Sequence, residues 1–425
     1  MTELDLDLKV ATRRLFWSMG YSTRLDVPLR GFSPIGEFSG RSRSPEMFTD
    51  LDVLGFSVVG GHRLSAEIAD CKTSRKESTA RMFWLRGIAD LFGADHAYLV
   101  RQHEVTDAAR QLSARLGITV LPGIELKNIQ DQYGPPLPDG EHPLAMLFDT
   151  SAAASHLAAF TKLDRQLNGL IEYRNFDYWV YEDYRNLVQM VAHLSGASRV
   201  LDPRNPIHVA LLIDLSWLYL LTLIRAITHI RGAFLSDLDR GLQEYMFGGV
   251  LNLQEKQEVA RLLVTLRPSK SSKKLDHLPP YYKLLLDLIF RLLRRPGQMQ
   301  TALRYAEVAT TFAAAKARVT LPDAFAFSSS FDAVAAKLVA DVCGFLVATA
   351  QLDSGFRWRV RAYLLAEEPP ASTHHVAASN SSPTPGIQRQ AIGGEPSQLE
   401  QLSLDHTDSK EDKKGTEEPP STSSS

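Results

Sequence analysis

Residues 50–72 decide the fold: Asp50-Leu-Asp-Val-Leu-Gly-Phe-Ser-Val-Val-Gly-Gly-His-Arg-Leu-Ser-Ala-Glu-Ile-Ala-Asp-Cys-Lys72. Two segments rich in apolar residues flank the Gly60-Gly61 pair, and each segment carries carboxylates. Short apolar runs on either side of a glycine turn are typical of a β-hairpin. We therefore expect strands over residues 50–59 and 63–72.

Successive side chains of a strand point to opposite faces, and this alternation sorts the polar residues of the hairpin. Asp70 and Lys72 share one face of their strand, and Asp50 and Asp52 share one face of theirs. Glu67 lies on the face opposite to Asp70, so we exclude it from any site to which Asp70 belongs.

The length of the turn decides whether the acids of the two strands meet. With a two-residue loop, Asp52 would lie opposite Ala69 and Asp70 would point to the other face. A three-residue loop pairs Val59 with Arg63 and brings Asp52 opposite Asp70. Glycine supplies the left-handed conformation that such a loop requires. A shared site therefore predicts the longer loop or an equivalent bulge.

The flanking segments predict a small mixed sheet with helices packed against it, which is an α/β N-terminal domain. Helical periodicity, a Thr106 cap and a Gly117 stop favour helices, and short apolar runs favour strands. The expected buried stripes are Leu4, Leu8, Ala11 and Leu15 in the first helix and Ala80, Phe83, Trp84, Gly87, Ile88 and Leu91 in the second. The predicted order is helix (3–19), strand (21–29), hairpin (50–72), helix (74–92), strand (97–100), helix (106–116) and strand (118–121).

Beyond this region the pattern becomes helical. A segment dense in glycine and proline, residues 134–140, indicates a linker at 131–150 between an α/β domain at 1–130 and an all-α domain at 151–366. Residues 367–425 are dominated by small and polar residues, so they cannot bury enough apolar area to offset the entropy of ordering. We expect a disordered tail there. The candidate helices are 152–170, 177–195, 207–231, 235–246, 253–266, 279–294, 299–318 and 331–351.

Composition restricts the class of protein. A chain of 425 residues with 44% hydrophobic and 23% charged residues can form two or three globular domains. The net charge of -2 means that any contact with nucleic acid must come from local patches. Two distant cysteines, Cys71 and Cys343, exclude a disulfide framework and a cysteine-based zinc site. Together with an N-terminus that lacks the apolar run of a signal peptide, they indicate a cytoplasmic protein.

The stretch Val209–Ile230 is apolar enough to be weighed as a membrane helix. It contains Asp214, Arg225 and His229, and charged side chains are costly in hydrocarbon. We therefore expect a buried helix of a soluble domain and no contact with a membrane.

Two other features have a functional and a structural interpretation. The aromatic run 173–181 could stack on bases, but aromatic residues more often pack in a core. The cations of residues 267–274 and 291–295 could contact phosphates, but such residues more often lie in solvated loops and helix ends. We favour the structural interpretation of both.

The residues Asp50, Asp52, Asp70 and Lys72 supply the chemistry that phosphodiester hydrolysis requires. Carboxylates can hold a divalent metal beside a phosphate, and hard oxygen ligands suit Mg²⁺ or Mn²⁺. A lysine beside the metal can position the attacking water and offset negative charge. The alternative is that the acids are solvated residues near a turn and that the lysine is an exposed cation.

This set of residues resembles a known family. Asp-x-Asp-Val followed by Asp-x-Lys, between an N-terminal helix and a helix-strand-helix-strand continuation, is similar to the PD-(D/E)XK, or restriction-endonuclease-like, nuclease superfamily. Its Mrr-like and Holliday-junction-resolvase-like branches are the most similar. The resemblance covers roughly residues 3–126.

The resemblance implies roles for individual residues. Asp52 and Asp70 would ligate Mg²⁺ with help from Asp50, and Lys72 would position the attacking water. Gln102 would be the polar residue that family members carry on the strand after the long helix.

Two further elements belong to the resemblance. Family members often add a glutamate from the first helix, and in this sequence only Glu3 could fill that position. The segment Val105–Arg110 resembles the second family helix, which often helps to hold phosphate.

The resulting expectation is a Mg²⁺- or Mn²⁺-dependent endonuclease that acts on DNA, in defence or in DNA processing. Its helical domain would select the substrate, bind a protein partner or form a homodimer. The alternative, from another class, is a catalytically inactive nuclease fold that binds nucleic acid or protein.

Overall fold

The computed structural model describes residues 3–30, 47–74, 78–133, 142–266, 278–326 and 331–367. Residues 1–370 belong to one compact unit. Except for Glu367, the tail expected over 367–425 lies outside the described residues.

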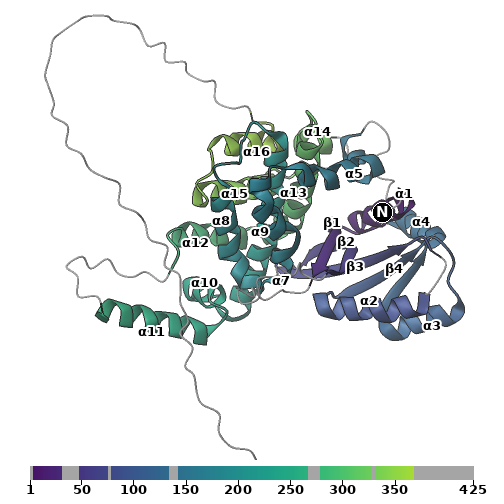
Figure 1. The fold of residues 1–425 in the computed structure, drawn as a ribbon, viewed down its shortest axis with the longest axis horizontal. Helices are drawn as coiled ribbons and strands as arrows, with labels where there is room; N and C mark the ends of the chain where they lie inside the picture. The colour runs from purple at the N-terminus through teal and green to yellow at the C-terminus, as the bar shows by residue number, and fades with distance from the viewer. Residues whose placement is uncertain are drawn as a thin grey trace, which may run out of the picture. The chain divides into compact units, whose positions relative to one another are not determined.

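A five-stranded mixed sheet forms the N-terminal part of this unit (Figure 1). The strands lie side by side in sequence order, with the first three antiparallel and the last two parallel to the third. Both the α/β class and the mixed sheet are therefore confirmed. The strands are β1 (Ser22–Arg30), β2 (Met47–Val59), β3 (Arg63–Lys72), β4 (His96–Arg101) and β5 (Ile118–Pro122).

The turn between β2 and β3 has the longer of the two loops considered. Val59 pairs with Arg63, so three residues form the connection. Gly60 and Gly61 adopt φ angles of 62° and 76°, the left-handed region that glycine enters without steric cost. The prediction of a three-residue loop is confirmed.

Helices cover both faces of the sheet (Figure 1), with α1 and α4 on one side and α2 and α3 on the other. The Thr106 side chain accepts a hydrogen bond from Ala109 N at the start of α3, and Gly117 ends this helix at φ 65°, as predicted. These helices are α1 (Glu3–Ser18), α2 (Ser78–Phe92), α3 (Asp107–Leu116) and α4 (Gly123–Gln132).

The buried faces of α1 and α2 differ from the predicted stripes. In α1 the buried residues include Leu6, Lys9, Val10, Arg13, Phe16 and Trp17, while Leu4 is exposed. The buried positions have the same helical spacing as the predicted stripe. Two of them, Lys9 and Arg13, are cations, so a search for apolar residues at this spacing does not find them. In α2, Met82, Leu85 and Ala89 are buried with Ile88, whereas Phe83 and Leu91 are exposed.

The C-terminal part is helical, as predicted. Helix α9 lies at its centre (Figure 1) and is buried almost along its whole length. Its length and composition would allow it to cross a membrane, but here neighbouring helices surround it. The helices are α5 (Thr150–Ala159), α6 (Asn168–Glu172), α7 (Tyr178–Val180), α8 (Asn186–Ala197), α9 (Pro206–Ala233), α10 (Leu238–Met246), α11 (Val250–Leu266), α12 (Tyr282–Leu293), α13 (Met299–Ala314), α14 (Leu321–Phe325), α15 (Ala333–Thr349) and α16 (Gly355–Leu365).

Two long helices expected at 152–170 and 177–195 are each interrupted. After α5, Leu163 and Asp164 adopt extended conformations, and the Asp164 side chain accepts a hydrogen bond from Gln166 N. This cap starts a new turn and ends the first helix early. The second is interrupted by extended backbone at Tyr181 and Glu182, and α8 resumes at Asn186.

Buried polar contacts join the helical part to the sheet. Glu307 of α13 accepts hydrogen bonds from Arg13 Nη2 at 2.8 Å and from Thr23 N at 2.7 Å. Asp214 of α9 pairs with Arg24 of β1 at 3.1 Å. Within the predicted linker, residues 143–148 form a 3-10 helix whose Leu144 and Leu147 are buried in the shared core. The segment expected to separate two domains therefore takes part in packing them together.

Candidate functional site

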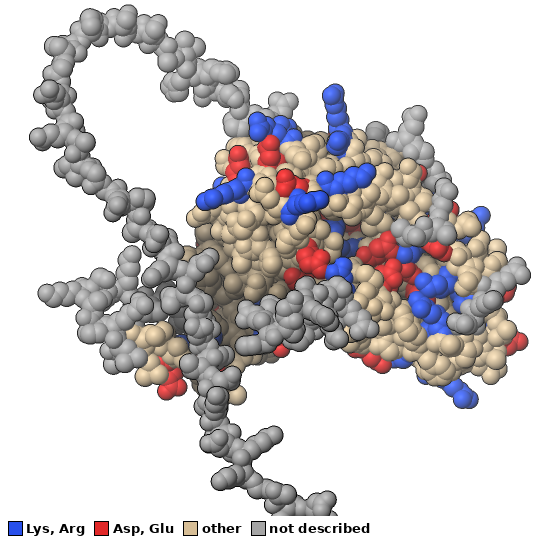
Figure 2. Space-filling view, in the orientation of Figure 1, with Lys and Arg blue, Asp and Glu red and all other residues tan. Residues whose placement is uncertain are grey.

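The structure brings Asp52, Asp70 and Lys72 together at the ends of β2 and β3. Lys72 Nζ lies 3.5 Å from Asp52 Oδ2 and 3.4 Å from Asp70 Oδ1. Both carboxylates are buried, whereas 34% of the lysine side chain is exposed. Figure 2 shows acidic and basic side chains gathered next to each other on the sheet-bearing part of the molecule. The register set by the three-residue turn therefore brings Asp52, Asp70 and Lys72 together, as expected.

Asp52 occupies the point at which the pairing of β2 and β3 stops. The last pair is Val53 with Ala69, and the next free N–H, that of Cys71, donates to Asp52 Oδ2 at 2.7 Å. Burial raises the pKa of Asp52, while the charges of Lys9 and Lys72 oppose this shift. The aspartate thus replaces a backbone partner and also faces two ammonium groups.

Lys9 is the cation that α1 brings to this site. Its Nζ lies 2.7 Å from Asp52 Oδ1 and 3.9 Å from Asp50 Oδ2, and it donates a hydrogen bond to Asp26. Burial acts to lower the pKa of Lys9, but Asp52 and Asp26 outweigh burial and raise it. The lysine is therefore a permanent positive charge beside the acids.

Asp26 is an acid of the site that the sequence analysis did not include. It lies on β1 between Leu25, which pairs with Val53, and Val27, which pairs with Leu51. Its φ of 51° is left-handed, which is unusual for a residue other than glycine and is held by surrounding contacts. Carboxylate oxygens of Asp26, Asp50 and Asp52 lie within 4.8 Å of one another.

Asp70 is held by Arg81, from α2. Arg81 Nε and Nη2 donate to the two oxygens of Asp70 at 2.7 and 2.6 Å. The guanidinium also lies over the Trp84 ring. Burial acts to lower the pKa of Lys72, but Asp70 and Asp52 raise it overall, so this lysine stays charged. The site therefore has a cation on each side of Asp70.

The structure does not place Gln102 beside these residues. It is exposed just past the end of β4, and its backbone N–H donates to Lys72 O at 3.2 Å. The residue paired with Lys72 on β4 is instead Arg101, which is buried and donates to Ser74 O. Side-chain alternation explains the difference, because only the residue directly beside Lys72 shares its face.

Three other residues considered from the sequence are Glu67, Glu3 and Arg110. Glu67 accepts a hydrogen bond from Tyr21, away from Asp70, as the alternation predicts. The side chain of Glu3 lies outside the described part of the structure. Arg110, in the helix expected to help hold phosphate, is paired with Glu125 at 2.7 Å and Glu104 at 3.3 Å.

Lys9, Asp26 and Arg81 were not predicted from the sequence, although Lys9 and Asp26 each had a signal. Lys9 lies at the helical spacing of Leu6 and Val10, on the face that is buried. Asp26 interrupts the apolar residues of a strand directly beside β2. Arg81 follows the Asp-x-Lys motif on the next helix, but nothing in the sequence fixes where its long side chain points.

Two sets of carboxylates could supply ligands to a divalent cation: Asp26, Asp50 and Asp52, whose oxygens lie within 4.8 Å of one another, and Asp52 with Asp70 on either side of Lys72. All available donors are carboxylate oxygens, the ligands that Mg²⁺ and Mn²⁺ prefer. Lys72 marks a position where a positive charge contacts both acids. Its contacts of 3.4 and 3.5 Å are longer than a strong charge-assisted hydrogen bond, and its partial exposure leaves it room to move aside.

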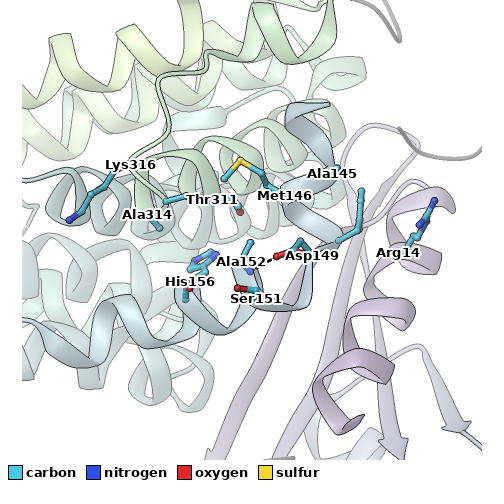
Figure 3. Close-up of a pocket in the computed structure, with 13 residues that line it drawn as sticks. Arg14, Ala145, Met146, Asp149, Ser151, Ala152, His156, Thr311, Ala314 and Lys316 are labelled. Carbon is cyan, nitrogen blue, oxygen red and sulfur yellow. Dashed lines mark hydrogen bonds between the residues drawn. The ribbon is translucent and has the colours of Figure 1, made fainter. Parts of the chain in front are cut away.

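Two cavities in the described structure are not lined by Asp52, Asp70 or Lys72. One of about 750 Å³ is lined by residues of α1, α5 and the end of α13, including Arg14, Asp149, His156 and Lys316 (Figure 3). A second, of about 290 Å³, reaches Asp26 and also includes His156. Burial lowers the pKa of His156 to about 3, so its imidazole is neutral at physiological pH.

Within the described residues, the aromatic run 173–181 and the cation Arg291 agree with the structural interpretation favoured from the sequence. Tyr173, Phe176 and Tyr178 are buried in the helical core and do not form an exposed stacking surface. The basic cluster at 267–274 lies outside the described residues, and Arg291 pairs with Asp341 at 3.3 Å.

Comparison of the chain with models of protein families, with curated proteins and with solved structures gave no match.

Proposed function

We propose that this protein is a metal-dependent nuclease that hydrolyses phosphodiester bonds in DNA, with a PD-(D/E)XK-like catalytic region. The observation that carries the proposal is the convergence of two buried carboxylates on one partly exposed lysine, Lys72. The order of elements also supports the proposal: a helix, three antiparallel strands and two parallel strands with intervening helices follow one another in the order that the resemblance implies.

Asp52 and Asp70 would hold a Mg²⁺ or Mn²⁺ ion, with Asp50 nearby at the surface. When bound, such an ion polarises a phosphate oxygen and lowers the pKa of a bound water. The burial of both carboxylates favours this role, because a charge in a poorly hydrated site gains more from a counter-ion than it does in bulk water.

Lys72, Arg81 and Cys71 would have separate roles beside the metal ion. Lys72 reaches solvent and can orient a water molecule and offset charge on the phosphate. Arg81 fixes the plane of the Asp70 carboxylate through two parallel hydrogen bonds, which restricts the direction of its free lone pairs. Cys71 N does the same for Asp52.

Cleavage of supercoiled plasmid DNA tests this function. We expect cleavage by the full chain with Mg²⁺ or Mn²⁺ and loss of cleavage with a chelator. Asp70→Ala and Lys72→Ala should each lower the rate by about 10²–10⁴-fold, the range typical of removing a positioned proton-transfer or water-orienting group. Asp131→Ala, which changes an exposed acid of α4, should cleave like the unchanged protein.

A second function is favoured by one observation. Protein groups already contact every carboxylate oxygen of Asp52 and Asp70. Such saturation is expected of an inactive nuclease fold that binds nucleic acid or protein. In that case no divalent ion would support cleavage, and labelled DNA would bind equally well with and without the chelator.

A further inference from the structure

We propose that Lys9 is a fixed internal cation that fills one of two cation positions, so that the site binds a single divalent ion. The inference rests on the proposed function for the ion between Asp52 and Asp70. It adds that the neighbouring group of Asp26, Asp50 and Asp52 is closed to metal by the ammonium of Lys9.

The geometry distinguishes the two positions. Lys9 Nζ contacts Asp52 at 2.7 Å, also bonds to Asp26, and only 6% of its side chain is exposed. Lys72 contacts its two acids at 3.4 and 3.5 Å and is far more exposed. A lysine that is buried and tightly bonded cannot leave without exposing its partners, whereas a loosely held lysine at the surface can.

The origin of the two lysines supports the same distinction. Lys9 projects from α1, whose neighbours Leu6, Val10 and Phe16 pack against the sheet. Its position is therefore set by the packing of a whole helix. Lys72 is the last residue of β3; its backbone is paired with Arg101 of β4, but 34% of its side chain is exposed.

Charge balance gives the physical reason. Three carboxylates within 4.8 Å of one another repel, and a positive charge among them removes that repulsion. A metal could supply this charge, but Lys9 already supplies it as part of the folded chain. Adding a divalent ion would then require displacing an ammonium that contacts two of these carboxylates and belongs to a side chain only 6% exposed.

The expected consequence is a change in metal stoichiometry when Lys9 loses its charge. Mn²⁺ binding to the full chain, counted by electron paramagnetic resonance of free Mn²⁺ and by titration calorimetry, should give one ion for the unchanged protein. Lys9→Gln keeps most of the length but not the charge, and it should bind two. Lys127→Gln, which changes an exposed lysine of α4, should bind one.

The outcomes separate the inference from the proposed function. Two ions in the unchanged protein, or one ion in both the unchanged protein and Lys9→Gln, would overturn the role of Lys9 and leave the nuclease proposal standing. No ion in the unchanged protein but one in Lys9→Gln would support the role of Lys9 and overturn the metal site at Asp70. No ion in either would overturn both.

A stability measurement covers the case in which Lys9→Gln does not fold alone. Three uncompensated carboxylates should make its folding depend on metal, as in proteins that fold only when their metal binds. Circular dichroism should then show refolding as Mn²⁺ is added. A variant that stays unfolded at every Mn²⁺ concentration would count against the inference.

Discussion

Two groups of buried charges in this protein use the same residue types but differ in their access to solvent. At the interface between sheet and helices, Arg13 pairs with Glu307, and Arg24 pairs with Asp214, with at most 12% of any of these side chains exposed. At the ends of β2 and β3 the acids are equally buried, but 34% of Lys72 is exposed. We call the first group the closed cluster because none of its side chains is more than 12% exposed, whereas the second group has a cation at the surface.

This difference separates a structural charge cluster from a candidate site. Arg13–Glu307 and Arg24–Asp214 are structural contacts that join the sheet to the helices, although their side chains also line the cavity of about 290 Å³. The group at the ends of β2 and β3 keeps its acids in a poorly hydrated environment while a partly exposed cation faces solvent, an arrangement that can tune ionisable groups for function. The three predictions below test this distinction.

The largest effect is expected at the closed cluster. Glu307→Ala should lower the free energy of unfolding by about 3–5 kcal/mol, because the buried Arg13 would lose its charged partner and keep only neutral hydrogen-bond acceptors. Thermal and chemical denaturation measure this change. The double variant Arg13→Met with Glu307→Leu should be clearly less damaging than the single one. If the double variant were equally unstable, loss of packing rather than an unpaired charge would be the cause.

A smaller, pH-dependent effect is expected at Asp214. Burial acts to raise its pKa, but Arg174 and Arg24 outweigh burial and hold the pKa below the ordinary value of 3.8. A carboxyl with a lowered pKa in the folded state contributes stability above pH 3.8 that is lost as the pH falls through the folded value. Asp214→Asn should therefore be less stable at neutral pH and should show a flatter loss of stability in acid. Acid titration followed by circular dichroism compares the two proteins; parallel curves would contradict the prediction.

The smallest effect is expected at an exposed pair that belongs to neither cluster. Arg86 and Asp90 lie one turn apart on α2, with 43% and 59% of their side chains exposed. Asp90→Ala should change the free energy of unfolding by only about 0.3–0.5 kcal/mol, and less at high salt. A decrease in the free energy of unfolding above 1 kcal/mol would show that the exposure of a charge pair does not predict its contribution to stability in this protein.

Local patterns were sufficient to predict much of the fold. The order of strands and helices through β5, the cap at Thr106 and the three-residue turn at Gly60 all follow from residues close together in sequence. The helices at 152–170 and 177–195 were predicted less well. Each is interrupted at one or two residues that cap a helix or adopt an extended conformation, and helical periodicity over a long window does not detect such short breaks. The predicted buried stripes of α1 and α2 were only partly right. Leu15 and Ile88 are buried, but Leu4, Phe83 and Leu91 are exposed, because long-range packing selects between two stripes of similar spacing.

For the site, the sequence by itself determined that Asp52, Asp70 and Lys72 share a face and meet, since strand alternation and one turn fix their positions. Only the tertiary structure decided which partners surround them. Lys9 lies on a helix packed against the sheet, and Arg81 lies on the helix that covers the other face. Asp26 lies on a neighbouring strand and itself adopts a left-handed conformation. The physical reason is range: backbone geometry fixes neighbours along a strand, whereas contacts between elements depend on how the whole core packs.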